Sequence, residues 1–203
     1  MTPPTGCELP ALDLCHVALL VLVAGRSMRM GSPKALMLHE GRPLIEHLLA
    51  PPLLREFGDV VVVLGHHADA VRPAVERCGY RCVVNPDPDR GRTGSVQAGL
   101  RALSTAARAV FVQPVDCPLI RPQTYVSLAT ALGTADVAVP SYCGQRGHPP
   151  LLSARIIPPI LAAAPDEPLR NLLQAADVDY RFVEVDDPGV LVNINRPEDL
   201  QAL

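Results

Sequence analysis

The sequence predicts an α/β protein with a mainly parallel sheet and helices on both of its faces. Two observations support this class: short apolar runs, such as residues 17–23 and 59–64, and segments of helical periodicity that alternate with them. Because the runs lack alternating polar residues, we expect both faces of each strand to be buried, as in parallel sheets. The helical segments that lie between the strands can then cover both faces of such a sheet.

The expected elements follow one another along the whole chain. We expect strands at residues 17–23, 59–64, 81–84, 109–113, 136–140 and 180–185, and a last extended segment at 190–195. We expect helices at residues 43–50 and 70–77, from Ser95, after Pro122, at 156–164 and 168–176, and from Pro197. Residues 1–15 lack a firm period and are expected to be a flexible N-terminal leader before a single domain at 16–203.

Composition argues against several classes of function. The chain has 203 residues, of which 48% are hydrophobic and 19% charged, as in ordinary globular domains. A formal net charge of −3 and the absence of tryptophan argue against nucleic acid as a partner. The apolar runs are too short to cross a membrane and the start lacks a secretory signal, so we expect a cytoplasmic protein. The spacing of Cys78 and Cys82 does not suit a zinc site, so we expect reduced thiols.

A glycine-containing loop follows the first expected strand, in the stretch LVAGRSMRMGSPKAL at residues 22–36. It carries Lys34, the only lysine of the chain, beside Gly25 and Gly31. A strand, a mobile backbone loop and a compact cation together are typical of phosphate binding. The spacing fits neither the Walker loop, because Ser32 and Pro33 separate Gly31 from Lys34, nor the dinucleotide fingerprint.

This loop resembles the motif LxxGxSxRMGxxK of the MobA-like nucleotidyltransferases, and is closest to the molybdenum cofactor cytidylyltransferases. The residues that fall on the motif are Leu22, Gly25, Ser27, Arg29, Met30, Gly31 and Lys34. The resemblance implies that the loop wraps the triphosphate of a bound nucleotide, whose charge Arg29 and Lys34 neutralise as catalytic residues. Ala24 is also placed in the nucleotide-binding set, and it favours CTP as the donor, because guanylyltransferases of the family tend to have a second glycine there.

A second stretch, NPDPDRGRTGSVQAGL at residues 85–100, resembles the NPxxxxGxxxSxxxGL segment of the same family. The resemblance implies that this loop and the start of the following helix read the base and approach the phosphates, with Asn85, Gly94 and Ser95 among the nucleotide-binding residues. Ser95 is also a suitable helix N-cap, which is the structural alternative. No base contact is assigned to Arg92, because relatives often carry small or apolar residues in this region.

Asp116 is the strongest candidate for a metal ligand. It lies just past an expected buried strand, between Pro114 and Pro118, where its hard oxygen could meet Mg²⁺ beside a triphosphate. The alternative is an aspartate that caps the end of the strand. The segment QPVDCPL at residues 113–119 resembles the family's central motif, which implies a catalytic, magnesium-binding role for Asp116.

The closing segment NINRPEDL, at residues 193–200, resembles a family motif often written DxDTPEDL. Relatives of the cytidylyltransferase branch frequently have aspartates where this chain has Asn193 and Asn195. We expect Asn195 to join Asp116 at the metal through its amide oxygen, which brings no charge. Mg²⁺ is the expected cofactor, with Mn²⁺ as an alternative, and the number of ions stays open.

The segment RGHP at residues 146–149 resembles the cytidylyltransferase branch in particular, which implies that Arg146 and His148 line the acceptor site. A histidine that merely orders a turn is the structural alternative for His148. Arg170 is interpreted as a residue of a helix surface, and His66 and His67 as exposed loop residues.

Together the resemblances run from about residue 17 to residue 200 and imply a GT-A type, three-layer Rossmann-like nucleotidyltransferase. The expected reaction is magnesium-dependent transfer of CMP from CTP to molybdopterin or its molybdenum form, with a molybdoenzyme as a further partner. One alternative is transfer to the phosphate of a sugar, an alcohol or a hydroxy acid. Another is a non-catalytic chaperone that binds nucleotide and cofactor.

Overall fold

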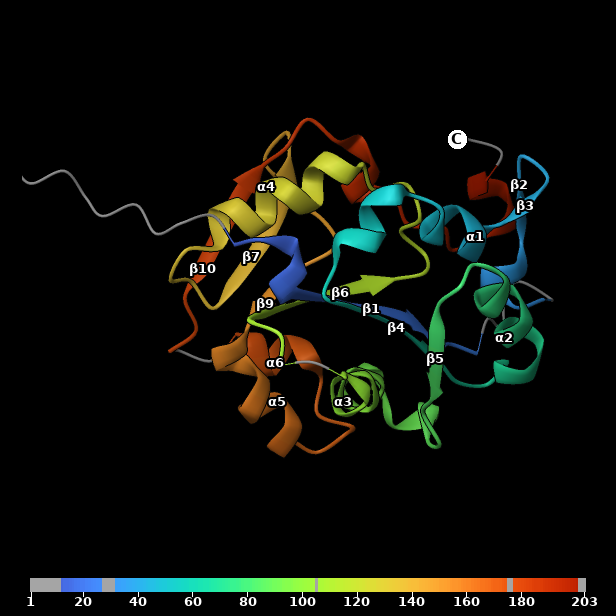
Figure 1. Ribbon diagram of the computed structural model, residues 1–203, viewed down its shortest axis with the longest axis horizontal. Coiled ribbons are helices and arrows are strands. Elements are labelled where there is room, and N and C mark those ends of the chain that lie inside the picture. Colours follow the sequence, from blue (N-terminus) through green and yellow to red (C-terminus); the bar gives the residue numbers. More distant parts are fainter. Residues whose placement is uncertain (1–11, 27–31, 105, 175–176, 201–203) are drawn as a thin grey trace, which may run out of the picture.

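The fold is a single eight-stranded, mainly parallel sheet between two layers of helices (Figure 1). The computed structural model describes residues 12–26, 32–104, 106–174 and 177–200. The strand order is β10-β7-β9-β6-β1-β4-β5, and β8 pairs with β7. The strands of this sheet are β1 (Val17–Val23), β4 (Asp59–Leu64), β5 (Arg81–Val84), β6 (Ala109–Pro114), β7 (Val137–Tyr142), β8 (Gln145–Arg146), β9 (Leu151–Ser153) and β10 (Tyr180–Glu184).

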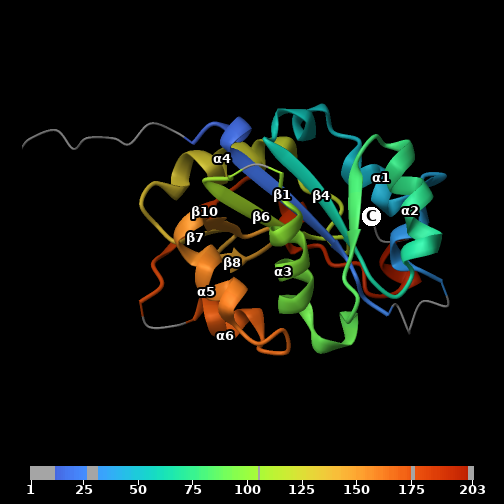
Figure 2. The ribbon, with the colours of Figure 1, turned by 60° about the horizontal axis from the view of Figure 1, so that its bottom comes forward.

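The helices divide between the two faces of the sheet (Figures 1 and 2). Their bounds are α1 (Leu44–Leu49), α2 (Ala68–Arg77), α3 (Arg92–Ala102), α4 (Pro122–Leu132), α5 (Ile157–Ala162) and α6 (Leu169–Leu173). One core joins α1, α2 and α4 to the sheet through residues such as Leu48, Val75 and Leu128. The other joins α3, α5 and α6 to the opposite face through residues such as Val96 and Ile160. The predicted three-layer class is therefore confirmed.

The central strand β1 explains why its sequence is apolar throughout. All seven of its residues are buried, and successive side chains enter opposite cores: Leu19 and Val21 pack on one face, and Leu20 and Leu22 on the other. β1 pairs in parallel with β4 on one side and with β6 on the other. Such double burial requires the uninterrupted apolar run that the sequence shows.

Two expectations about elements were wrong, and one strand was missed. Helix α3 begins at Arg92 rather than at Ser95, because Gly91 adopts a φ of 114° just before it and turns the chain into the helix. Part of the predicted extended segment 190–195 belongs instead to the 3-10 helix Pro188–Leu191. The antiparallel strand β9 between β6 and β7 was not predicted, since a run of three residues gives too little pattern.

Smaller elements complete the chain. A two-stranded hairpin consists of β2 (Leu38–His39) and β3 (Arg42–Pro43). The remaining elements are 3-10 helices at Leu14–His16, Lys34–Leu36, Pro52–Glu56, Pro88–Arg90, Ala154–Ile156 and Pro197–Leu200.

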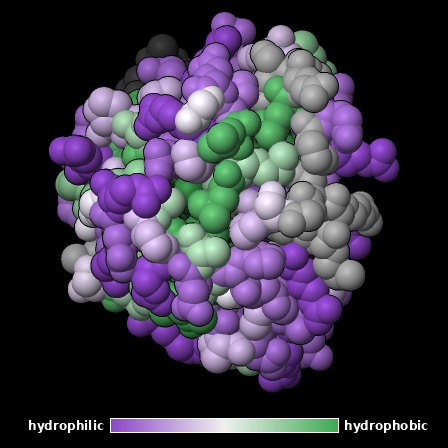
Figure 3. Space-filling view, turned by 90° about the vertical axis from the view of Figure 1, so that its right-hand side faces the viewer, coloured by the Kyte–Doolittle hydropathy of each residue, from purple (hydrophilic) through white to green (hydrophobic). Residues whose placement is uncertain are grey.

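The face that carries α1 and α2 is hydrophilic around an apolar central strip (Figure 3). Across the described ranges, every helix is too short or too polar to traverse a bilayer.

Helix α3 lies unusually close to the sheet. A Cβ added to Gly99 would come within 2.9 Å of Cγ2 of Val63 and 3.0 Å of Cδ1 of Leu20. Because Gly99 has no side chain of its own, the backbone of α3 packs directly on the side chains of Leu20 in β1 and Val63 in β4. Its first turn is thereby held at the edge where these strands end.

The opposite end of β4 carries a charged group inside the protein. Asp59 is 9% exposed and accepts hydrogen bonds from Nε of Arg81 at 3.3 Å and from the backbone N–H and hydroxyl of Ser104 at 2.8 and 2.9 Å. Burial by itself would raise the pKa of Asp59, but the hydrogen bonds from Arg81 and Ser104 outweigh it and hold that pKa below its usual value.

We expect Asp59→Asn to lower the free energy of unfolding at pH 7 by about 1–3 kcal/mol, because the charge-assisted bonds are weakened. A carboxylate whose pKa is lower in the folded protein stabilises it above the unfolded pKa of about 3.9 and loses this effect as the pH falls through the folded value. Urea unfolding between pH 7 and pH 3 should therefore show the difference from wild type shrinking below about pH 4. The exposed Asp69→Asn on α2 is the control, and a difference that stays constant across this range would contradict the account.

Candidate active site

A cleft opens where β1 and β6 end, with a cavity volume of about 290 Å³. Three segments supply most of its wall: the end of β1 with the following loop, the start of α3, and the turn after β6. The described lining residues are Leu22, Val23, Ala24, Gly25, Pro33, Lys34, Ala35, His67, Val71, Pro88, Gly91, Arg92, Ser95, Pro114, Val115 and Asp116. Of the predicted site residues, the cleft thus brings together Leu22, Ala24, Gly25, Lys34, Ser95 and Asp116.

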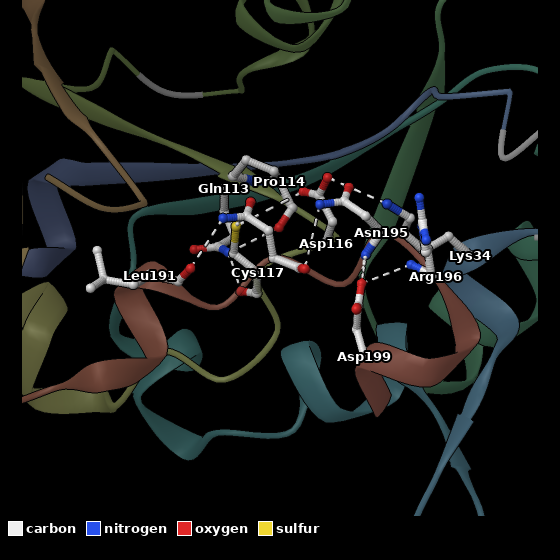
Figure 4. A network of polar contacts seen from close by, with 10 residues as sticks. Lys34, Gln113, Pro114, Asp116, Cys117, Leu191, Asn195, Arg196 and Asp199 are labelled. Atoms are coloured by element: carbon white, nitrogen blue, oxygen red, sulfur yellow. Dashed lines mark hydrogen bonds and ion pairs between the residues drawn. The ribbon is translucent and has the colours of Figure 1, made fainter. Parts of the chain in front are cut away.

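Lys34 and Asp116 face each other in this cleft (Figure 4). Nζ of Lys34 lies 3.5 Å from Oδ2 of Asp116, and their side chains are only 16% and 24% exposed. Asp116 is held there because the chain continues the pairing beyond β6: the N–H of Val115 donates to the carbonyl of Leu22 at 3.1 Å. Of the described lining residues, Asp116 is the only carboxylate.

The closing segment of the chain passes directly beside Asp116. The N–H of Ile194 donates to the carbonyl of Asp116 at 2.8 Å. The N–H groups of Asn195 and Arg196 donate to Oδ2 of Asp199 at 2.6 and 2.8 Å, and these bonds lower the pKa of Asp199. Asp199 therefore fixes the turn that carries Asn195, although Asn195 itself does not belong to the cleft lining.

Cys117 joins the same two segments through its thiol. Its Sγ lies 3.2 Å from Oδ1 of Asn193, and burial, helped by the charge of Asp116, raises the pKa of Cys117 to about 12. The group therefore remains S–H at neutral pH and donates to the amide oxygen. This protonation makes Cys117 a structural donor rather than a nucleophile. The five cysteines of the described ranges are all free thiols, as predicted.

The first turn of helix α3 points into the cleft. Of the predicted nucleotide-binding residues in this stretch, Ser95 lines the cleft, whereas Asn85 and Gly94 do not. Ser95 lines the cleft inside the helix, and its Oγ accepts a hydrogen bond from Nδ2 of Asn85 at 3.1 Å, so the N-cap interpretation is wrong. Asn85 lies behind the wall and also accepts the N–H of Asp87 at 3.1 Å. Gly94 packs behind it too, with its N–H on the carbonyl of Pro165 at 3.1 Å.

A group of charged residues spans one rim of the cleft. Nε of Arg26 donates to Asp89 at 2.6 Å, and Nε2 of His66 lies 2.7 Å from the same carboxylate. His67 lines the cleft, and its Nε2 lies 3.0 Å from the carbonyl of Arg26. Hydrogen bonding to Arg26 lowers the pKa of Asp89. Both histidines lie in the loop after β4, where the sequence predicts exposed loop residues: His66 is exposed and His67 is half-buried. Their partners come from other loops and could not be predicted, because nothing in the sequence indicates that three separate loops meet here.

The predicted acceptor residues lie outside the cleft lining. The guanidinium of Arg146 stacks over the ring of Phe182, with Cζ 4.1 Å from the ring centroid. The N–H of His148 donates to the carbonyl of Val190 at 2.9 Å, which places this histidine beside the closing segment. Burial, followed by the charge of Arg92, lowers the pKa of the His148 ring. Ser27, Arg29, Met30 and Gly31 lie outside the described residues.

The described donor set suits a divalent cation better than a soft metal. Nowhere in the described ranges do three or more His, Cys, Asp or Glu side chains gather into a metal-binding group. The described lining offers one carboxylate, that of Asp116, and the segment that contains Asn195 passes beside it. Hard oxygen donors of this kind fit Mg²⁺ or Mn²⁺, which use water and phosphate oxygens for the rest of their coordination.

Residues 19–180 match the MobA-like NTP transferase domain. The chain belongs to the MobA-like NTP transferase family. The nicotine blue oxidoreductase of Paenarthrobacter nicotinovorans is 32% identical over 156 residues, which cover 73% of this chain and 76% of that protein. The bifunctional protein GlmU of Corynebacterium aurimucosum is 36% identical over 126 residues, or 59% of this chain, but these span only 26% of GlmU.

Solved structures share the fold over almost the whole chain. The homolog of Rv0371c from Mycobacterium sp. strain JC1 has a TM-score of 0.78 at 25% identity, covering 93% of this chain and 94% of that one. Rv0371c of Mycobacterium tuberculosis H37Rv in complex with manganese has a TM-score of 0.77 at 23% identity, covering 93% and 97%. The mostly parallel, Rossmann-like architecture is thus shared with these proteins.

We expect Gly91→Ala to destabilise the protein by about 1–3 kcal/mol, since a φ of 114° strains any side chain. It should also weaken binding of a nucleoside triphosphate, tested here with CTP, about tenfold, because it moves the first turn of α3 at the cleft wall. Gly79→Ala is the matched control: its φ is 82°, but it does not line the cleft. Urea unfolding and calorimetric titration with a non-hydrolysable CTP analogue measure the two effects, and equal CTP affinity in both variants would argue against this role of α3.

Proposed function

We propose that the protein transfers the nucleoside monophosphate of an NTP to a phosphorylated acceptor and releases pyrophosphate. CTP is the preferred donor, and molybdopterin or its molybdenum form the preferred acceptor. The observation that carries the proposal is the 3.5 Å contact between Lys34 and Asp116 inside the cleft. One cation and one carboxylate, which we propose as a metal ligand, thus lie together at the ends of two paired parallel strands.

The donor site is supported by the chemistry of the cleft walls. A triphosphate needs N–H groups and cations along its path. The loop after β1 offers the exposed backbone of Gly25, and the first turn of α3 offers the positive end of a helix. Lys34, the single lysine of the chain, adds a point charge that can follow the phosphates during the reaction. The motif residues Ser27, Arg29 and Gly31 are proposed to extend this wall.

Asp116 and Asn195 are proposed to hold a divalent metal ion, Mg²⁺ or Mn²⁺. When bound, such an ion neutralises phosphate charge and orients the donor. The manganese complex of Rv0371c supports a divalent ion in proteins of this fold. Because Asn195 brings no charge, Asp116 would be the main electrostatic anchor of the ion.

No side chain is required to activate the nucleophile. An oxygen of the acceptor phosphate is already anionic and forms the new bond to the α-phosphorus, while the bond to the leaving pyrophosphate breaks and pyrophosphate keeps the electron pair. The protein then contributes position and charge neutralisation. The protonated, buried Cys117 agrees with this assignment, since it has no thiolate to attack with.

Pyrophosphate release separates the alternatives. The purified protein is incubated with each NTP, Mg²⁺ and molybdopterin, and with sugar phosphates in place of the pterin. We expect CTP- and pterin-dependent release that falls at least about 100-fold in Asp116→Asn, since an electrostatic contact to the reacting groups is lost.

Each other outcome has a defined meaning. Pyrophosphate release with a sugar phosphate but not with the pterin would identify a sugar phosphate as the acceptor. Binding of nucleotide without pyrophosphate release would favour the non-catalytic chaperone. The name of the nicotine blue relative raises a redox reaction as well. Oxidation of NADH or NADPH without pyrophosphate release would contradict nucleotidyl transfer.

We expect Lys34→Arg to reduce turnover about tenfold or more, or about 1.4 kcal/mol in the barrier, because a planar guanidinium cannot follow the reacting phosphates as an ammonium does. Binding of cytosine-containing nucleosides without phosphates should stay unchanged. Arg181→Lys is the control, because it exchanges the same two residue types in the reverse direction at an exposed position on β10. Wild-type turnover in Lys34→Arg would show that the site does not need a lysine ammonium group at this position.

A further inference from the structure

Arg92 is a cationic residue of the cleft that has no assigned role. It lines the cavity from the first position of α3 and is exposed. Within the described ranges its side chain makes no hydrogen bond or ion pair, whereas its neighbour Arg90 pairs with Asp166 at 3.2 Å. An arginine that faces a cavity without a carboxylate partner is positioned for an anionic ligand.

The charge of Arg92 acts on groups that lie around Asp116. The positive charge of Arg92 reaches both Cys117 and His148 and acts against a protonated ring at His148. Asp116 acts on His148 as well, and Arg92 and Asp116 line the same cavity. The N–H of His148 bonds to Val190, and four residues further along the chain the N–H of Ile194 bonds to Asp116, so His148 adjoins the part of the cleft that holds Asp116 and Arg92.

His148 supplies an independent sign of an unfilled site. Its Nδ1 is buried, yet no group of the described chain bonds to it. Buried polar atoms nearly always have a hydrogen-bond partner, and one without a partner points to a bound ion, water or ligand. The backbone N–H of His148 is fixed on the carbonyl of Val190, so the ring is held in place beside the closing segment.

In-line displacement places negative charge on both sides of the reacting phosphorus. The attacking phosphate and the leaving pyrophosphate lie on opposite sides of the α-phosphorus, and both are anions. A cation on one side cannot neutralise both, because Coulomb attraction falls with distance. Lys34, in the loop after β1, is proposed to serve the donor phosphates, and Arg92 is the other arginine or lysine among the described lining residues, which makes it available for the acceptor phosphate.

We propose that Arg92, with His148 beside it, forms the anion subsite that binds the phosphate group of the acceptor. This inference rests on the proposed nucleotidyl transfer and names the part of the acceptor that the protein recognises. The guanidinium can donate two parallel N–H bonds to one phosphate. The subsite therefore selects a phosphate monoester dianion over an acceptor that offers only a hydroxyl group.

Kinetics with molybdopterin separate acceptor binding from donor binding. Arg92→Gln should raise the KM for the acceptor at least tenfold and leave the dissociation constant of a non-hydrolysable CTP analogue within about twofold. Arg92→Lys should recover part of the loss, because it restores charge without the planar fork. Arg101→Gln, at the far end of α3, is the matched control and should behave as wild type. An unchanged acceptor KM in Arg92→Gln, or a matching loss of CTP affinity, would overturn the assignment.

A binding measurement keeps the subsite testable if no pyrophosphate is released. Inorganic phosphate is titrated into ¹⁵N-histidine-labelled protein saturated with the CTP analogue, and the ring signal of His148 is assigned with His148→Gln. We expect phosphate to shift this signal in wild type and Arg101→Gln and to leave it unshifted in Arg92→Gln. An Arg92-dependent shift without catalysis would refute the proposed function but support the subsite. A missing shift in wild type, or an unaltered one in Arg92→Gln, would refute the subsite.

Discussion

The parallel pairing of β1 with β6 is the constraint on which the site depends. In this register Leu22 lies opposite Pro114, so the loop that carries Lys34 and the turn that carries Asp116 leave the sheet side by side. The bond from Val115 to Leu22 extends the pairing by one more residue. Two residues that are distant in sequence thereby meet within a cleft, with no contact of their own needed to bring them together.

The other segments around the cleft are fixed by individual polar contacts rather than by the sheet. Asp199 holds the turn that contains Asn195, and the thiol of Cys117 ties the closing segment to the turn after β6. Asp89 joins two loops on the opposite rim. Because each contact connects elements from different parts of the chain, the cleft can keep its shape while its floor carries the charges needed for phosphate chemistry.

The sequence was sufficient to predict the layers, because buried parallel strands have uninterrupted apolar runs. It was also sufficient to predict that Lys34 and Asp116 lie close together, because the ends of parallel strands share one edge of the sheet. It was not sufficient where geometry depends on one backbone angle or on a distant partner. The φ of Gly91 moves the start of α3 and turns Ser95 from an expected cap into a cleft residue. The partners of His66 come from other loops, and the position of Arg92 follows only from the placement of α3.

Manganese binding tests most directly whether Asp116 and the donor site form one metal–triphosphate centre. Electron paramagnetic resonance would give the Mn²⁺ affinity of wild type and Asp116→Asn with and without a non-hydrolysable CTP analogue. The account predicts that the analogue tightens Mn²⁺ binding by about tenfold or more in wild type, and that this coupling disappears in Asp116→Asn. Equal coupling in both proteins would show that the ion is held elsewhere and would contradict the central claim.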